Sequence, residues 1–134
     1  VIIDMGTATT VTVVDEKGSY IGGAIMPGIF TSLNALTQGT SLLPSIEIKA
    51  PKKAIAKATS DAMKAGLIYG NAGSIDGILD EFEKEIGKPA SIVSTGGLGK
   101  LVCPYCKHEI KHDPMLLLKG LGIIWQKNQK SRKK

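Results

Sequence analysis

Three short strand signals at the start of the chain constrain the fold more than any other feature. Runs rich in β-branched residues cover 1–5, 9–14 and 20–26, and the turn-forming stretch 16–19 joins the last two. Consecutive strands that are joined by short turns usually pair as neighbours. We therefore expect a three-stranded antiparallel meander that ends at Pro27.

Helical periodicity dominates the middle of the chain. Apolar residues recur at helical spacing over about 29–37, where Gly39 can end a short helix, and again from Thr59 or Ser60 to Ile86. The longer segment contains a row of glycines, each costing about 1 kcal/mol relative to alanine inside a helix. These glycines are Gly66, Gly70, Gly73 and Gly77. Two interpretations stay open: one helix whose glycine face meets another backbone closely, or two helices divided after Gly70.

The last third of the chain predicts one more strand and two more helical segments. A buried strand at 91–94 runs into a glycine pair, a helical stretch covers about 98–106, and a closing helix covers about 114–126, with Asp113 as its N-cap. The expected order is βββααβα with one further short helical stretch, which indicates an α/β fold. We expect one domain over 1–126, followed by a basic, disordered tail.

Charge and hydropathy exclude two classes of partner. Residues 127–134 hold five of the 17 Lys and Arg residues, so the rest of the 134-residue chain is balanced against its 12 Asp and Glu residues. Arg132, the only arginine, lies in that tail, which argues against nucleic-acid binding. No apolar run approaches the roughly 18 residues of a transmembrane helix, so we expect a cytoplasmic protein without membrane contact. Because Val1 begins directly inside a strand with no initiator Met, we also expect residues to be missing upstream.

Three glycine-containing loops are the candidate sites for chemistry. Asp4 ends the first strand, Gly6 allows a close turn, and Thr7 supplies a hydroxyl and an N–H group suited to a phosphate. A carboxylate beside such a loop makes sense with a cation between them, because Asp is a hard oxygen ligand. The alternative is a tight β-turn in which Asp4 only accepts backbone hydrogen bonds. Further glycine loops lie at 22–28 and 94–97, and we expect all three to face one cleft.

Several runs, in this order and spacing, resemble the C-terminal half of type III pantothenate kinases. They are DMGTATT, GGAIMPGI, SLNAL, LPSIEI, TSDAMKAGLIYGNAGSIDGIL, STGGLGKL and LLLKGL, and the likeness covers nearly all of 1–124. The resemblance implies a ribonuclease H-like domain of the actin/hexokinase/Hsp70 superfamily, the second of two such domains. It also implies ATP-dependent phosphorylation of pantothenate to 4′-phosphopantothenate, the first step of coenzyme A biosynthesis, with ATP bound in the cleft between the domains.

The resemblance also implies roles for individual residues. ATP with Mg²⁺ would bind beside the glycine loops, and a monovalent cation, K⁺ or NH₄⁺, would bind a carboxylate. Pantothenate would contact a threonine that acts across a homodimer interface, of which the long helix is a part. The implied residues are Asp4 for the monovalent cation, Gly6, Thr7, Gly96 and Gly97 for ATP, and Thr59 for pantothenate.

The chain departs from the family pattern in ways that affect catalysis. The D-x-G-N-T phosphate loop and the G-x-D-R motif, whose Asp is the general base, have no counterpart in it. The catalytic base is therefore expected in the absent N-terminal domain, and this chain alone should be inactive. The usual G-K-N-T also reads Ala-Lys-Ala-Thr at 56–59. The alternative function is a noncatalytic nucleotide-binding or regulatory module of the same fold.

A cluster of cysteine and histidine residues near 103–112 invites other interpretations. Cys103 and Cys106 form a C-P-Y-C motif, and His108 and His112 follow it. The spacing is compatible with a redox motif or a strained zinc site, but the Asp-Pro at 113–114 interrupts the long helix that a thioredoxin-like site needs. The simplest interpretation is two semi-buried thiols.

Overall fold

The computed structural model describes residues 1–132, and within that range the strands form one five-stranded sheet in the order β3-β2-β1-β4-β5. β1 pairs antiparallel with β2, and β2 with β3, so the predicted meander is confirmed. β4 pairs parallel with β1, and β5 parallel with β4. The strands are β1 (Ile2–Met5), β2 (Ala8–Val14), β3 (Tyr20–Pro27), β4 (Val93–Thr95) and β5 (Lys111–His112). β5 was not predicted, because two residues carry no periodic signal.

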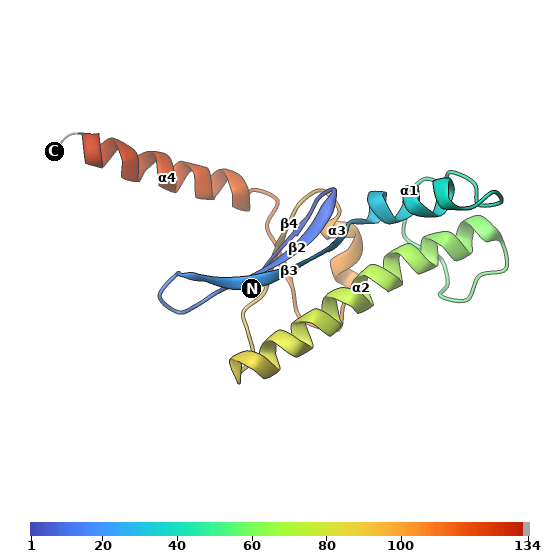
Figure 1. Cartoon of the computed structure of the whole chain (residues 1–134), viewed down its shortest axis with the longest axis horizontal. Coiled ribbons are helices and arrows are strands. Elements are labelled where there is room, and N and C mark those ends of the chain that lie inside the picture. The colour runs from blue at the N-terminus through green and yellow to red at the C-terminus, as the bar shows by residue number, and fades with distance from the viewer. Residues whose placement is uncertain (133–134) are drawn as a thin grey trace.

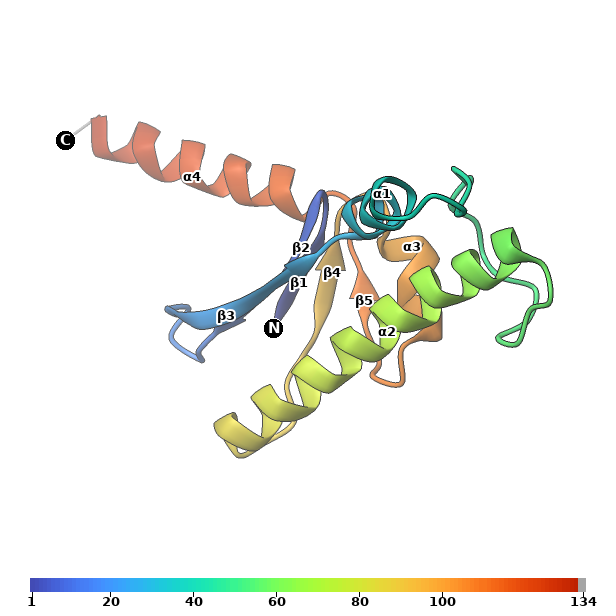
Figure 2. The same ribbon diagram turned by 45° about the vertical axis from the view of Figure 1, so that its right-hand side comes forward.

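Two helices lie on one face of this sheet, and the last helix extends away from it. Figures 1 and 2 show α1 and α2 on the same side of the strands, with α3 between the sheet and α2. The elements are α1 (Ile29–Gly39), α2 (Thr59–Ile86), α3 (Gly99–Val102), the 3₁₀ turn η1 (Cys103–Tyr105) and α4 (Leu116–Arg132).

Helix α2 is continuous over 28 residues, so the interpretation as two helices is wrong. It ends where Gly87 adopts a left-handed conformation with φ of 78°, which closes the last turn through a bond to the Glu83 carbonyl. The four interior glycines are exposed, and a Cβ added at any of them would meet no atom within 4 Å. The row of glycines predicted a second backbone packed closely against this face of α2, but no segment of the described chain lies there.

The core lies between the sheet and the buried face of α2. Alternate residues of β2 point inward, while the residues between them lie on the opposite face of the sheet. The principal buried side chains are Ile3 and Met5 from β1, Val11 from β2, Ile29 and Leu33 from α1, and Leu67, Ile68, Ile75 and Leu79 from α2. This packing holds the carboxyl ends of β1 and β4 in fixed positions beside α1.

Helix α4 differs from the closing helix that the sequence predicted. It continues to Arg132, so residues 127–132 are helical rather than disordered, while residues 133 and 134 lie outside the described part. Its start also differs: the predicted helix begins at 114 with Asp113 as its N-cap, whereas α4 begins at Leu116, and the Asp113 Oδ1 accepts a 3.0 Å hydrogen bond from the Met115 N–H in the turn before the helix. No helix in the described part is long and apolar enough to cross a membrane.

Candidate functional site

The turn that follows β1 is held by the connection between β3 and α1. The Thr7 carbonyl accepts hydrogen bonds from the Gly28 N–H at 3.1 Å and from the Thr31 Oγ1 at 2.7 Å. A Cβ at Gly28 would lie 2.4 Å from the Gly6 carbonyl oxygen, so only glycine fits there. The glycine loop after β1 therefore contacts the end of the loop at 22–28. Gly22 itself is paired with Val13 inside the sheet and does not contact the turn.

The loop after β4 reaches the same end of β1. Gly96 has a φ of 91°, and a Cβ there would lie 2.5 Å from the Met5 carbonyl oxygen. Gly97 is exposed, with nothing within 4 Å of an added Cβ. β4 ends beside β1 because the two strands are parallel neighbours. Parts of all three predicted loops thus converge on the backbone of residues 5–7.

Asp4 lies on the sheet face that points away from α2, in a row of polar side chains. Its register partners are Thr10 on β2 and Thr95 on β4, so the three side chains are neighbours on that face. Asp4 is exposed, and no hydrogen bond or ion pair with the side chains of residues 1–129 engages its carboxylate. The position of Thr95 directly beside Asp4 was missed by sequence reasoning, since only the pairing of β1 with β4 places it there.

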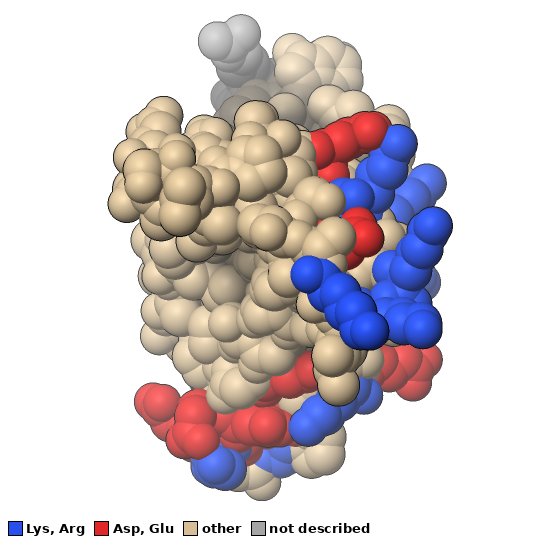
Figure 3. Space-filling model, turned by 90° about the vertical axis from the view of Figure 1, so that its right-hand side faces the viewer, with Lys and Arg blue, Asp and Glu red and all other residues tan. Residues whose placement is uncertain are grey.

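Thr59 does not join this group but begins α2 at the far end of a groove. The groove has a volume of about 930 Å³ and runs between α1 and α2, from Pro27 and Thr31 beside the Thr7 turn to Thr59. None of the residues that line it is charged. Figure 3 shows this end of the molecule, where charged side chains gather at the right and along the bottom of the view and leave the upper left uncharged.

The cysteine and histidine residues are divided between two clusters, and no group of three or more metal-ligating side chains forms in the described part. Cys103 Sγ and His112 Nδ1 both contact the buried Ser94 Oγ, at 3.2 and 3.0 Å. Cys106 Sγ instead lies 3.9 Å from the Ala72 carbonyl oxygen, and burial raises the pKa of its thiol to about 12. The structure thus favours two semi-buried thiols over a zinc or redox site.

His108 belongs to the second cluster, around the buried Asp76 of α2. The Asp76 carboxylate accepts hydrogen bonds from the Lys107 N–H at 2.8 Å, the His108 N–H at 3.1 Å and, at 2.8 Å, the His108 Nδ1. Burial raises the pKa of Asp76, but these hydrogen bonds outweigh that effect, so its pKa is lowered. Sequence reasoning missed this pairing, and its one available signal is an acidic residue among the buried residues of α2.

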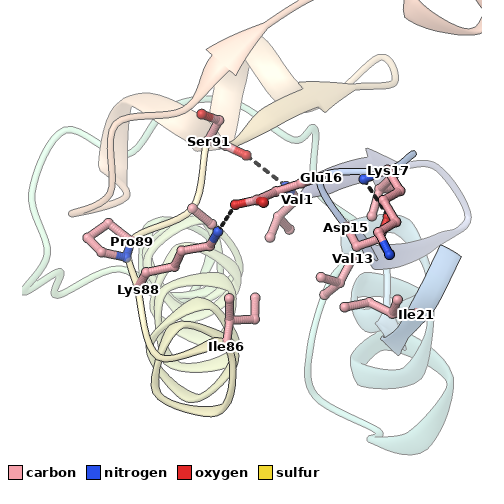
Figure 4. Close-up of a pocket in the computed structure, with 12 residues that line it drawn as sticks. Val1, Val13, Asp15, Glu16, Lys17, Ile21, Ile86, Lys88, Pro89 and Ser91 are labelled. Atoms are coloured by element: carbon pink, nitrogen blue, oxygen red, sulfur yellow. Dashed lines mark hydrogen bonds and ion pairs between the residues drawn. The ribbon is translucent and has the colours of Figure 1, made fainter. Parts of the chain in front are cut away.

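A second hollow lies at the opposite end of the strands, where β1 begins and β2 ends, and contains none of the predicted site residues. It encloses about 620 Å³ around Val1, the β2–β3 turn and the segment after α2 (Figure 4). There Lys88 contacts Glu16, and the Val1 nitrogen donates a 2.7 Å hydrogen bond to the Ser91 carbonyl. These contacts tie the hairpin to the start of β4, which is a structural role.

Comparison with known proteins places these features in one family. A family model described as type III pantothenate kinase matches residues 1–81. Curated type III pantothenate kinases from Syntrophus aciditrophicus, Koribacter versatilis and Dictyoglomus turgidum are 44%, 44% and 45% identical over 96%, 98% and 96% of this chain, and the matches cover 50%, 48% and 51% of those proteins. The chain therefore spans about half the length of the curated relatives that it matches.

A solved structure supports the fold independently. A Campylobacter jejuni protein described as a conserved Baf family transcriptional activator superposes with a TM-score of 0.68, at 24% identity, over 96% of this chain and 58% of its own. At this identity the similarity concerns the fold alone.

Proposed function

Because the chain belongs to the type III pantothenate kinase family, we propose that it supplies one half of an enzyme that transfers the γ-phosphoryl group of ATP to pantothenate. The product is 4′-phosphopantothenate, the first intermediate of coenzyme A biosynthesis. The half supplied here is the C-terminal one. The general base belongs to the other half, so the 134-residue chain alone is inactive. The enzyme acts in the cytoplasm.

The convergence of the glycine loops on residues 5–7 is the observation that supports this proposal best. Phosphoryl transfer depends on positioning and on neutralising charge, with little covalent chemistry for the protein to perform. Gly28 and Gly96 let the two loops pack directly against the turn, because a Cβ at either position would collide with the carbonyl oxygen of Gly6 or of Met5. The turn is further fastened to α1 by Thr31, which makes it a preorganised surface.

We assign the ATP side of the site to the residues around this turn. Gly6 and Thr7 are exposed at the end of β1, where the N–H and the hydroxyl of Thr7 are available to a phosphate, while the Gly6 N–H donates a 3.1 Å hydrogen bond to the Ala8 carbonyl. Gly96 and Gly97 follow β4 and form the adenosine side. In an open sheet with parallel strands, ligands bind beyond the carboxyl ends of those strands, and β1 and β4 end here.

Asp4 and its neighbours fit a cation. The Asp4 carboxylate is exposed and free of side-chain partners among residues 1–129, and Thr10 and Thr95 lie beside it in the sheet. Carboxylate and hydroxyl oxygens are hard donors, which suits K⁺ or NH₄⁺ and, with the phosphates of ATP, Mg²⁺. Bound cations would offset the charge of the transferring phosphoryl group, and Asp4 holds the negative charge that keeps them there.

Thr59 and the groove beside it form the substrate and dimer side of the proposal. Thr59 is exposed at the first turn of α2, where its hydroxyl can meet pantothenate held by another subunit. The four exposed glycines of α2 leave room for a second backbone, and two of them, Gly66 and Gly70, line the groove. We therefore propose a homodimer that packs along α2.

The fold proposal follows from the sheet. Three antiparallel strands followed by parallel strands in the order β3-β2-β1-β4-β5, with α1 and α2 on one face, agree with a ribonuclease H-like domain of the actin/hexokinase/Hsp70 superfamily. A two-domain kinase of this kind would hold ATP between this domain and a similar one. About half of each curated relative lies outside the matched region, which leaves space for that second domain.

The function is tested by comparing the 134-residue chain with the full-length protein. By full-length protein we mean the proposed polypeptide of about twice this length that contains this chain as its C-terminal half. ADP release is measured with ATP and pantothenate, with and without K⁺. K⁺-dependent, pantothenate-dependent release by the full-length protein alone supports a kinase site divided between two halves. Nucleotide binding without pantothenate-dependent release by either protein would favour the noncatalytic module of the same fold.

A further inference from the structure

The buried Ser94 side chain of β4 joins two other segments of the chain just before the glycine pair. Its Oγ lies 3.2 Å from the Cys103 Sγ, directly after α3, and 3.0 Å from the His112 Nδ1 of β5. The hydroxyl carries one proton, so it can donate to only one of these two partners. Burial raises the pKa of the Cys103 thiol, which therefore keeps its own proton. All three groups are paired when the thiol donates to Ser94 and the Ser94 hydroxyl donates to the His112 Nδ1.

The His112 ring also lies directly against Gly99, the first residue of α3. A Cβ added at Gly99 would lie 2.4 Å from the His112 Nδ1 and 2.5 Å from its Cε1, so any larger residue would displace the ring. The main chain holds the ring in this position, because β5 pairs with β4 (Figure 2) and the Asp113 N–H donates a 2.8 Å hydrogen bond to the Ser94 carbonyl. The imidazole is therefore a fixed support for the start of α3.

Gly99 in turn closes the glycine loop after β4. Its N–H donates a 3.3 Å hydrogen bond to the Gly96 carbonyl, which makes the loop one tight turn. Gly96, at the other end of that turn, packs against the backbone of β1. The turn is consequently held at both ends, by β1 at Gly96 and by His112 at Gly99, while Gly97 between them is exposed.

We propose that His112 is a positioning residue for the adenosine side of the ATP site. It does not touch the nucleotide itself but fixes Gly99, and through Gly99 the turn that presents Gly97. This inference rests on the proposed function, which places ATP at this turn. The adenosine part of ATP lies away from the reacting phosphoryl group, so its contacts are the same before and during the transfer. A residue that positions such contacts affects the KM for ATP and leaves kcat unchanged.

Two substitutions of similar shape test this role in the full-length protein. His112→Asn keeps an oxygen that can accept the Ser94 hydroxyl as Nδ1 does, whereas His112→Leu has no hydrogen-bonding group. We expect the KM for ATP to rise about tenfold with leucine and less than about threefold with asparagine, and kcat to stay within about twofold in both. A role in stability alone would lower the active fraction, so kcat would fall at an unchanged KM. That result, or equal KM values for the two variants, would overturn the proposal.

A double-mutant cycle tests the contact between His112 and Gly99. Gly99→Ala needs the space that the ring occupies, so it should raise the KM for ATP about tenfold, as His112→Ala does. Once His112→Ala has removed the ring, the nearest atom to the new Cβ is the Ser94 Oγ at 3.4 Å, which is an ordinary contact. The double variant should therefore show about the tenfold rise of either single variant. A rise of about a hundredfold would mean that the two residues act independently, and would overturn the proposal.

Binding of ADP separates this inference from the proposed function, because it needs neither pantothenate nor turnover. The Kd for ADP, measured by equilibrium dialysis, should follow the KM pattern of the His112→Leu and His112→Asn variants. That pattern without phosphorylation of pantothenate would reject the kinase and keep the positioning role. Phosphorylation with the same ADP affinity in all three proteins would keep the kinase and overturn the positioning role. No ADP binding by the unsubstituted protein would overturn both.

Discussion

The Thr31 side chain and the Thr7 main chain are joined by a 2.7 Å hydrogen bond, in which the Thr31 hydroxyl donates to the Thr7 carbonyl. The same carbonyl accepts the Gly28 N–H at 3.1 Å. Both bonds cross from the β3–α1 connection to the turn after β1. The position of that turn is thus fixed by α1, which packs into the core through Ile29 and Leu33.

Removing the Thr31 hydroxyl should loosen the turn. Thr31→Val keeps the shape of the side chain but loses the donor, and we expect unfolding in urea to become easier by about 1 kcal/mol. In the full-length protein the KM for ATP should rise severalfold, because the phosphate-binding backbone is less well positioned. Thr31→Ser retains the hydroxyl and should behave like the unsubstituted protein. If Val and Ser variants show the same KM, the hydrogen bond does not position the turn.

Gly96 should be far less tolerant of substitution than its neighbour Gly97. Alanine at position 96 would combine a φ of 91° with a Cβ only 2.5 Å from the Met5 carbonyl oxygen. Strain of this kind costs about 1–3 kcal/mol, and relief requires β4 or β1 to shift. Gly97→Ala meets open space and is the matched control. Thermal unfolding of both variants tests this, and equal stability would show that the close approach at Gly96 is relaxed in solution.

Much of this arrangement could be predicted from the sequence, because the signals involved are local. The meander, α1 and the start and end of α2 follow from alternation, helical periodicity and the left-handed Gly87. The three glycine loops could be expected to face one cleft, because each of them directly adjoins a predicted strand in the sequence. Their shared contact with the backbone of Met5 and Gly6 is a tertiary fact, set by the parallel pairing of β1 with β4.

Other features depend on contacts between distant residues and left no local trace. The pairing of Asp76 with His108 joins positions 32 residues apart, and the two-residue strand β5 exists only because β4 lies beside it. The helical state of residues 127–132 was missed because a run of lysines was taken as solvated chain, although lysine is a good helix former. Site roles assigned by resemblance, such as that of Thr59, remain predictions.

Replacing Asp4 should abolish the effect of K⁺ and spare the fold. Asp4→Asn removes the charge that holds the cation, so turnover of the full-length protein should fall on the order of 100-fold and no longer respond to K⁺. Because Asp4 is exposed, the stability of the 134-residue chain should change by no more than about 0.5 kcal/mol. Undiminished K⁺ activation in Asp4→Asn would reject the cation assignment, and a large loss of stability would give Asp4 a structural role instead.

Acid should weaken the fold partly through Asp76. The pKa of this carboxyl is lower in the folded chain than its ordinary value of 3.8, so its ionised form stabilises the fold fully above that value. The contribution is lost as the pH falls below 3.8 through the folded pKa. Asp76→Asn should cost about 1–3 kcal/mol at pH 7 and little at the acid end, which flattens the pH dependence of urea unfolding.

Asp80 offers the matched control for this measurement. It is the next acidic residue on the same face of α2, with its Oδ1 3.5 Å from the His108 Nε2, but its side chain is 60% exposed. Asp80→Asn should therefore change stability by well under 1 kcal/mol and keep the acid sensitivity of the unsubstituted chain. Matching profiles for the two variants would mean that the hydrogen bonds from residues 107 and 108 do not set the acid response.

The two cysteines should react slowly with alkylating reagents while the chain is folded. Burial raises the pKa of Cys103, and that of Cys106 to about 12, with the Asp76 charge adding to the second effect. Thiolate is the reactive form, so at pH 7.5 iodoacetamide should modify the folded chain at least about tenfold more slowly than the chain in urea. Variants in which one cysteine is replaced by serine show the modification rate of the cysteine that remains. Fast, stoichiometric modification of either residue in the folded chain would revive the redox interpretation of the C-P-Y-C motif, because such a motif requires a low-pKa, accessible thiol.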